Sequence, residues 1–280
     1  MPDTGFFVRI QGKATNNKQE SVKYSTKRNP KIRTATIDFG RVSRKRHNIA
    51  GILEMDVTIA RENLKKIRKD KRVSFNGWLV KVISDTLVEH KQIAAYVRRK
   101  KRLFLFDDVT VSLVVEKEKQ GIRVPIPLLI QHTNRKNPTE ISREIEIARQ
   151  KEIPENEVIL HEKMSPIMKV YYYLPPFLRR YIWKTMIRHP RLAYGRMGNV
   201  VISSVGMMGR VNGWFIHSTL HPVSFGIGSI TEKPWVIDGK ICVREILHMT
   251  ILFDHDVVDG GEMARFVNKL VRNIEQGSIS

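Results

Sequence analysis

The chain has 280 residues, of which 49 are Lys or Arg and 28 are Asp or Glu, so its formal net charge at pH 7 is +21. Hydrophobic residues make up 41% of the chain, which excludes a disordered basic protein, because such chains lack the apolar surface that offsets conformational entropy. The single cysteine, Cys242, excludes a disulfide framework and a cysteine-cluster metal site.

No stretch of the chain reaches the roughly 18 uninterrupted apolar residues of a membrane-spanning helix. The first residues lack the apolar core of a secretory signal. We therefore expect a cytoplasmic protein, either soluble or bound peripherally to a membrane. The charge leaves nucleic acid, an anionic membrane surface and a phosphate-bearing cofactor open as partners.

Residues 1–47 are polar and basic and predict an N-terminal arm, with one strand near Thr34–Phe39. The alternating segment Asn48–Thr58 predicts a strand, and Ile59–Arg68 has the spacing of an amphipathic helix. Residues 48–280 are predicted to form one catalytic domain behind the arm.

A second helix is predicted from Gly77 to about His90, capped by Ser74 or Asn76. A hairpin follows, with strands at Val109–Val115 and Ile122–Ile130. Pro125 and Pro127 confine the second of these strands to a sheet edge or an irregular position.

The helix opened by Asn137 and Pro138 should run to about Gln150. The last third is rich in strands, and Asp238-Gly239 predicts a two-residue hairpin turn. A final helix is expected at about Gly261–Ile274. The expected strands are Asn199–Val205, Val223–Ile230, Trp235–Ile237 and Ile241–Phe253. The pattern predicts an α/β protein with a mixed sheet and flanking helices.

The densest chemical signal is the run from Asp254 to Gly261, DHDVVDGG. A histidine at a strand end, His255, with the carboxylate of Asp259 four positions on, suits a positioned base, since neutral imidazole accepts a proton near neutral pH. The run alone is equally compatible with a capped strand-to-helix turn, in which Asp259 is the N-cap and His255 is a satisfied polar residue.

The wider sequence resembles the catalytic domain of the dihydrolipoyl acyltransferases, the core components of 2-oxoacid dehydrogenase complexes. Phe253–Leu270 is similar to the signature FDHRxxDGxxxARFxxxL of that family, and Val200–Gly209 resembles its TISSLG strand. Further similar motifs occur in matching order, so that the resemblance covers about residues 46–152 and 198–276. These motifs are Val73–Ala94, Gly121–Ser142, Pro222–Gly228 and Lys233–Val243.

The resemblance implies a chloramphenicol acetyltransferase-like two-layer sandwich that assembles as a homotrimer or a multiple of three. It implies acyl transfer between a thioester and a thiol by direct attack, without an acyl-enzyme. His255 would be the general base, Ser203 would donate a hydrogen bond to the oxyanion, and Asp259 would hold the geometry of the site. Ser204, one residue on, lies on the opposite face of a strand from Ser203. The substrate would be a coenzyme A thioester, and no metal is expected.

The chain departs from the family pattern in three ways. Asp256 follows the histidine where the family usually has Arg. No lipoyl domain, partner-binding domain or swinging linker is recognisable, so the acyl group should come from acyl-CoA or from a separate lipoyl protein. Residues 158–197 form a basic and aromatic insertion, which Pro175-Pro176 divides into two short helices.

The insertion allows two interpretations. Basic side chains beside aromatic ones suit an anionic membrane surface or an anionic carrier, whereas a helical hairpin with buried stems and solvated charges needs no ligand. We therefore expect an acyltransferase that uses coenzyme A thioesters. The alternative is a non-catalytic trimeric or cage-forming relative that binds an anionic partner. Nucleic-acid binding alone ranks last, because no recognisable reading module is present.

Overall fold

The computed structural model describes residues 24–26, 32–67, 72–99, 101–119, 122–150, 166–204 and 212–278. The chain divides into two units, Met1–Pro30 and Lys31–Ser280. The second unit contains the helices and strands described below. Residues 1–23 of the expected arm lie outside the described residues.

The second unit is built on a mixed six-stranded sheet with the order β1-β8-β7-β6-β4-β5. Strands β6 and β7 are parallel, as are β4 and β6, and the other neighbours are antiparallel. A separate two-stranded hairpin joins β2 to β3. The strands are β1 (Asn48–Asp56), β2 (Tyr96–Arg98), β3 (Arg102–Phe104), β4 (Val111–Lys119), β5 (Ile122–Ile130), β6 (Val200–Ser204), β7 (Val223–Ile237) and β8 (Lys240–Asp254).

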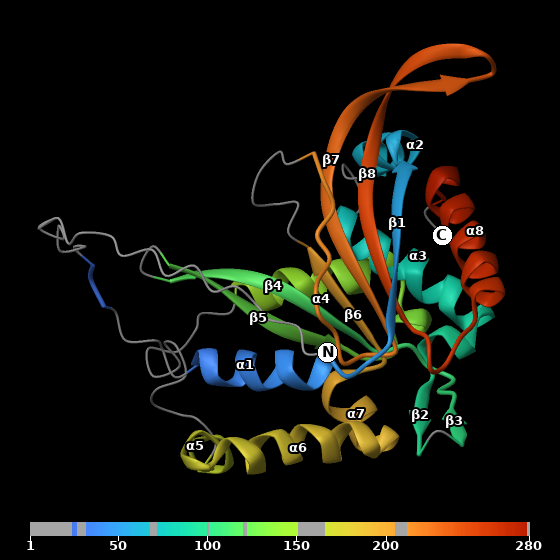
Figure 1. Ribbon diagram of the computed structural model, residues 1–280. Helices are drawn as coiled ribbons and strands as arrows, with labels where there is room; N and C mark the ends of the chain where they lie inside the picture. Colours follow the sequence, from blue (N-terminus) through green and yellow to red (C-terminus); the bar gives the residue numbers. More distant parts are fainter. Residues whose placement is uncertain are drawn as a thin grey trace, which may run out of the picture. The chain divides into compact units, whose positions relative to one another are not determined.

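Three of the helices cover one face of this sheet. The helices are α1 (Ile32–Ser43), α2 (Thr58–Ile67), α3 (Phe75–Glu89), α4 (Pro138–Gln150), α5 (Pro166–Tyr173), α6 (Pro176–Arg188), α7 (Pro190–Met197) and α8 (Gly260–Gln276), with 3-10 turns η1 (Lys91–Ala94) and η2 (Thr133–Arg135). Helix α3 packs against α4 and α8, and α8 contacts β1, which places these helices beside the sheet (Figure 1). The two layers confirm the expected sandwich.

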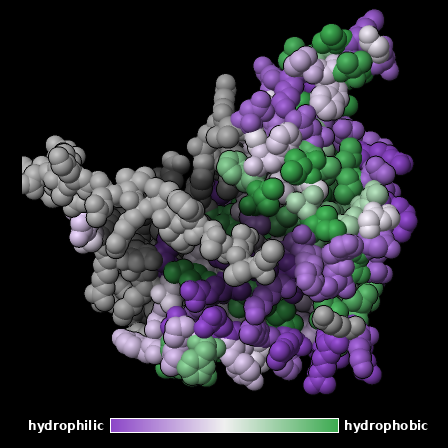
Figure 2. Space-filling model, in the orientation of Figure 1, coloured by the Kyte–Doolittle hydropathy of each residue, from purple (hydrophilic) through white to green (hydrophobic). Residues whose placement is uncertain are grey.

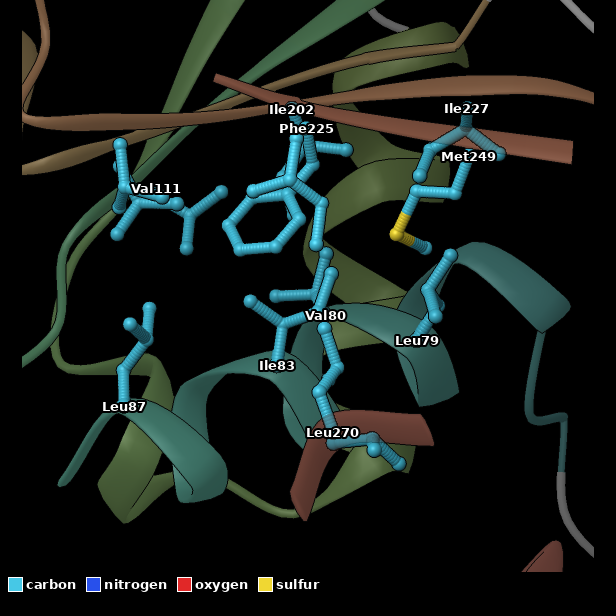
Figure 3. Close-up of a cluster of buried hydrophobic side chains, with 14 of the residues drawn as sticks. Leu79, Val80, Ile83, Leu87, Val111, Ile202, Phe225, Ile227, Met249 and Leu270 are labelled. Carbon is cyan, nitrogen blue, oxygen red and sulfur yellow. The ribbon is translucent and has the colours of Figure 1, made fainter. Parts of the chain in front are cut away.

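The main hydrophobic core lies between the sheet and α3. Apolar side chains of alternate strand residues point toward the helix, among them Ile202, Phe225 and Met249, and meet Val80 and Ile83 (Figure 3). Because strand side chains alternate between faces, the residues between them lie on the opposite face of the sheet. That opposite face carries the polar groups discussed below.

Several local predictions are confirmed. Ser74 caps α3 by accepting a hydrogen bond from the Gly77 amide. Strand β5, which contains Pro125 and Pro127, lies at a sheet edge as expected. Asp238 and Gly239 both have positive φ, 50° and 75°, as the tight turn between two paired strands requires. The strands predicted at 223–230 and 235–237 form the single long strand β7.

The strand expected near Thr34–Phe39 is wrong, because these residues belong to helix α1. Asp38 is buried and accepts hydrogen bonds from Arg179 Nε at 2.7 Å and Tyr171 Oη at 3.3 Å. Phe39 packs edge-on against Trp183 of α6. The inward-facing residues of α1 include this paired carboxylate and Ser43 as well as the apolar Val42, so hydrophobic periodicity did not reveal the helix.

The insertion folds as predicted in outline, with α5 and α6 separated at Pro175-Pro176. Arg179 is buried in the ion pair with Asp38, whereas Tyr173, Phe177 and Tyr181 are exposed. The hydrogen-bonded stems match the packed-hairpin interpretation, and the role of the exposed residues in binding a membrane or carrier stays a prediction. No helix of the described residues has the length and apolar character needed to cross a bilayer.

His221 predicts a pH dependence of stability. It is buried, and its Nε2 donates a hydrogen bond to the Met197 carbonyl at 2.8 Å. Burial lowers the pKa of this imidazole to about 4, below its value in the unfolded chain. The unfolded state therefore binds the proton more tightly, so His221 stabilises the fold fully above pH ~6.5 and loses up to about 3 kcal/mol as the pH falls to ~4.

Urea denaturation between pH 4 and pH 7 measures this contribution. The variant His221→Gln should show a weaker loss of unfolding free energy with acid than the wild type. His189→Gln, at an exposed position, should retain the wild-type slope. Parallel pH profiles for all three proteins would contradict a neutral, buried His221.

Candidate functional site

The turn between β8 and α8 carries the candidate base, His255. The Asp254 carbonyl closes the turn by accepting hydrogen bonds from the Val257 and Val258 amides at 3.0 and 3.2 Å. The Nδ1 of His255 lies 2.8 Å from the Val258 carbonyl oxygen. Because a carbonyl can only accept, Nδ1 carries the proton, and in the neutral ring Nε2 keeps a free lone pair. The residue is exposed, so this lone pair is accessible to a substrate.

This turn is tied to the residues that lead into β1. The backbone amide of His255 donates to the His47 carbonyl at 2.8 Å. The buried Arg46 Nη2 pairs with Asp254 Oδ2 at 2.5 Å, and His47 Nδ1 lies 2.9 Å from Asp256 Oδ1. The carboxylate of Asp256 is therefore hydrogen-bonded to His47. The sequence analysis did not identify Arg46 and His47 as site residues, because neither lies in a recognisable motif.

Burial dominates the electrostatics of Asp254. Desolvation raises the pKa of its carboxyl group above the ordinary value, while the Arg46 guanidinium acts in the opposite direction. The ion pair is thus the favourable interaction that offsets part of the desolvation of a buried carboxylate. Because Asp254 immediately precedes His255, its ion pair with Arg46 supports the turn that carries the histidine.

Asp259 is the N-cap of α8. Its side chain accepts a hydrogen bond from the Glu262 amide at 2.9 Å, which satisfies one of the free amides at the start of the helix. The predicted role of holding the local geometry is compatible with this cap, and so is the plain capped turn. Asp259 therefore stabilises the start of α8, the helix that follows the His255 turn.

Ser203 lies on β6, where Ile202 packs into the core. Alternation therefore places Ser203 on the face opposite the helices and Ser204 on the core face. Ser203 is level with Gly226 on β7, which is level with Thr250 on β8.

His255 and Ser203 are not brought together within one chain. His255 is five residue positions from Thr250 along the direction of β8, which corresponds to about 16 Å, and β6 and β8 are two strand spacings apart, or about 10 Å. Two groups at such a separation cannot act on one carbonyl. Within one chain, His255 and Ser203 therefore do not form a single site.

No cluster of three or more His, Cys, Asp or Glu side chains able to hold a metal ion occurs within the described ranges. The candidate site offers a histidine with a free nitrogen and the ion pair that supports the turn that carries it, and the Ser203 hydroxyl lies on β6.

The chain matches the family model of the 2-oxoacid dehydrogenases acyltransferase catalytic domain over residues 47–158 and 191–278. It is 25% identical over 219 residues to the dihydrolipoyllysine-residue acetyltransferase component of the pyruvate dehydrogenase complex of Rickettsia typhi, covering 77% of this chain and 45% of that protein. The chain spans less than half the length of the curated relatives it matches.

Two solved structures have the same fold. They are the cubic core of the pyruvate dehydrogenase multienzyme complex and the dihydrolipoamide acetyltransferase of Azotobacter vinelandii. Each is 14% identical, has a TM-score of 0.65, and aligns over 94% of this chain and 97% of its own.

The pair of Arg46 and Asp254 predicts a strong and pH-dependent effect on stability. Arg46→Leu should lower the free energy of unfolding by about 3–5 kcal/mol at pH 7, because it leaves a buried carboxylate without its partner. Since burial raises the pKa of Asp254 in the fold, protonation of the orphaned group should reduce this deficit as the pH falls.

The double variant Arg46→Leu/Asp254→Asn removes the unpaired charge and is the matched control. It should recover part of the stability lost in the single variant when both are unfolded in urea at pH 7. A double variant as unstable as Arg46→Leu would show that lost packing, not the buried charge, causes the effect.

Proposed function

This chain belongs to the 2-oxoacid dehydrogenase acyltransferase family, and we propose that it transfers an acyl group from a thioester to a thiol acceptor by direct attack. The thioester would be that of coenzyme A or of a lipoyl group. The observation that carries the proposal is the hydrogen bond from His255 Nδ1 to the Val258 carbonyl, because it leaves Nε2 as the basic nitrogen.

In the proposed reaction, His255 Nε2 removes the proton from the acceptor thiol. The thiolate attacks the thioester carbonyl, and the electron pair of the carbonyl moves to oxygen. Ser203 of a neighbouring copy donates a hydrogen bond to this oxyanion, an interaction that contributes a few kcal/mol in comparable sites. The intermediate collapses, the original thiolate leaves, and it takes the proton from the imidazolium.

Their spacing in the sequence supports the proposed roles of Ser203, His255 and Asp259. The Azotobacter structure is described as an investigation of a serine, a histidine and an asparagine in catalysis, with the serine 52 positions before the histidine and the asparagine four positions after it. Ser203, His255 and Asp259 have the same spacing. Aspartate replaces asparagine at the last position, where it caps α8. The relatives are named acyltransferases, which favours catalysis over a purely structural scaffold.

Replacement of the base tests the mechanism. His255→Gln should lower the rate of acyl transfer from acyl-CoA to dihydrolipoamide by about 10²- to 10⁴-fold, the usual contribution of a general base. Because the ring is exposed and contacts only the local turn, the melting temperature should stay near that of the wild type. Undiminished transfer by a correctly folded His255→Gln variant would exclude His255 as the base.

We further propose that the chain assembles as a trimer or a multiple of three, since His255 and Ser203 are too far apart to share a carbonyl within one protomer. The hairpin formed by the ends of β7 and β8 extends beyond the rest of the sheet and shows hydrophobic groups at its surface (Figures 1 and 2). Val236 lies opposite Ile241, with Val243 two residues on from Ile241 on the same face, and all three are about 70% exposed or more. An exposed apolar face of this kind suits burial against a second copy.

Subunit complementation is the sharpest test of this arrangement. A preparation refolded from equal amounts of His255→Gln and Ser203→Ala chains should recover activity, because a mixed interface can join an intact His255 from one chain to an intact Ser203 from its neighbour. In randomly mixed trimers about one quarter of the sites are complete. Each variant alone should show only its residual rate, and a mixture no more active than its parents would contradict a shared site.

The hairpin gives an independent check by sedimentation. The triple variant Val236→Ser/Ile241→Ser/Val243→Ser should shift the protein toward the monomer, whereas Cys242→Ser on the opposite face of the hairpin should sediment like the wild type.

A further inference from the structure

A pocket of about 200 Å³ opens on the sheet face opposite α3, α4 and α8. Three segments that are distant in sequence line it, together with Ala50 of β1 and Leu252 of β8. They are the end of α1 with Ser43 and Arg44, the lead into β1 with Arg46 and Asn48, and the loop before β7 with His217 and Ser218. No acidic side chain is among its lining residues.

Polar atoms without partners gather at this pocket. Seven buried side-chain nitrogen or oxygen atoms of the described residues lack a hydrogen-bond partner, and three of them belong to lining residues: Arg46 Nε, Asn48 Oδ1 and His217 Nδ1. An unsatisfied buried polar group costs about 1–3 kcal/mol. Of these atoms Arg46 Nε is a donor and Asn48 Oδ1 is an acceptor, so an occupant with an acceptor oxygen would supply the hydrogen bond that Arg46 lacks.

The packing of His217 fixes which of its nitrogens faces this region. Its Nε2 lies 2.9 Å from the hydroxyl of the buried Ser224. A Cβ added at Gly226 would lie 3.0 Å from Nδ1 and 3.1 Å from the Phe215 carbonyl, so the ring edge is held over the sheet where glycine leaves room. Burial lowers the pKa of His217 against the opposing effect of the Phe215 carbonyl, which keeps the ring neutral. If Ser224 donates to Nε2, Nδ1 carries the proton, and the neighbouring Phe215 carbonyl competes with any ligand as its acceptor.

The polar part of the lining is rich in donors and positive charge, beside the apolar Ala50, Ile216 and Leu252. Arg46 pairs with Asp254 through Nη2, its buried Nε–H has no partner among the described residues, and Arg44 adds a second guanidinium. The Ser218 hydroxyl and the Asn48 amide can also donate. Oxygen anions are the ligands that guanidinium groups and N–H donors recognise best.

We propose that this pocket binds a small oxyanion, of the carboxylate or phosphate class. Resting on the acyl transfer proposed above, the oxyanion is a charged group of the substrate away from the reacting carbonyl. Arg46 lines the pocket and also pairs with Asp254, which precedes His255 in the turn. The same arginine would therefore contact the bound anion and hold the turn that carries the base.

Titration calorimetry with sodium succinate and with inorganic phosphate tests the pocket without any enzymatic turnover. The wild type should bind at least one of the two saturably at low salt. Arg44→Gln and His217→Gln should weaken that binding at least tenfold. Lys45→Gln removes the same charge from the neighbouring exposed position, which does not line the pocket, and should bind like the wild type.

The absence of saturable binding, or equal weakening by Lys45→Gln, would overturn the proposal and leave the pocket filled with water. The melting temperature of His217→Gln shows whether that variant is folded, and Arg44→Gln, at an exposed position, provides an independent measurement. Because free anions are used, these results do not depend on whether the protein transfers acyl groups.

Kinetics then identify the source of the anion. Succinyl-CoA and butyryl-CoA have acyl chains of the same length, and only the first carries a free carboxylate. If the pocket takes an acyl carboxylate, Arg44→Gln should raise KM for succinyl-CoA alone. If it takes a phosphate of coenzyme A, KM should rise equally for both donors. Unchanged KM values for both would exclude a substrate group from the pocket.

Discussion

The buried ion pair between Arg46 and Asp254 is the interaction on which the candidate site depends. Strands β1 and β8 pair in antiparallel register from Asn48 opposite Asp254 to Asp56 opposite Ile246. This pairing brings Arg46 and His47 beside the end of β8, where the chain must leave the sheet and start α8. Without that support the turn would rest on its own few hydrogen bonds, and His255, an exposed side chain on a short turn, would lose its fixed orientation.

The two faces of the sheet differ in composition: one packs into the hydrophobic core, and the other carries polar residues and the pocket. The core face is apolar and packs on α3 and α8, so its composition follows from burial alone. The opposite face carries Ser203, Gly226 and Ser224 together with the pocket. Polar residues in the middle of a long strand are poorly explained by packing, and their concentration on one face is what an active or binding surface requires.

Much of the fold could be predicted because the signals are local. Ser74 before an apolar run predicted the start of α3, Asp238-Gly239 predicted the tight turn, and Pro125 and Pro127 predicted an edge strand. The helix α1 could not be found in the same way, because one of its buried residues, Asp38, is charged and its partner, Arg179, is 141 residues away.

Only part of the candidate site could be predicted, again because some of its contacts join residues that are distant in sequence. His255, Asp259 and Ser203 lie in motifs, whereas Arg46, His47 and His217 acquire their positions from strand pairing and from a loop over Gly226. Their partners are far away in sequence, and neither composition nor periodicity encodes such contacts. The distance between His255 and Ser203 is likewise a property of sheet register, which appears only when the order and direction of β6, β7 and β8 are known.

The structure shows where some of the positive charges behind the net charge of +21 lie. Part of it is neutralised inside the fold, as Arg179 is by Asp38 and Arg46 by Asp254. Arg44, by contrast, lines a pocket without acidic residues, and the exposed surface of α6 is basic and aromatic. A uniformly charged surface would attract any polyanion, whereas the proposed pocket, with two guanidinium groups and the unpartnered Arg46 Nε–H, would select an anion by size and geometry. Non-specific attraction falls steeply with salt, whereas binding that is held by buried hydrogen bonds falls less, so the salt dependence of anion binding separates the two contributions.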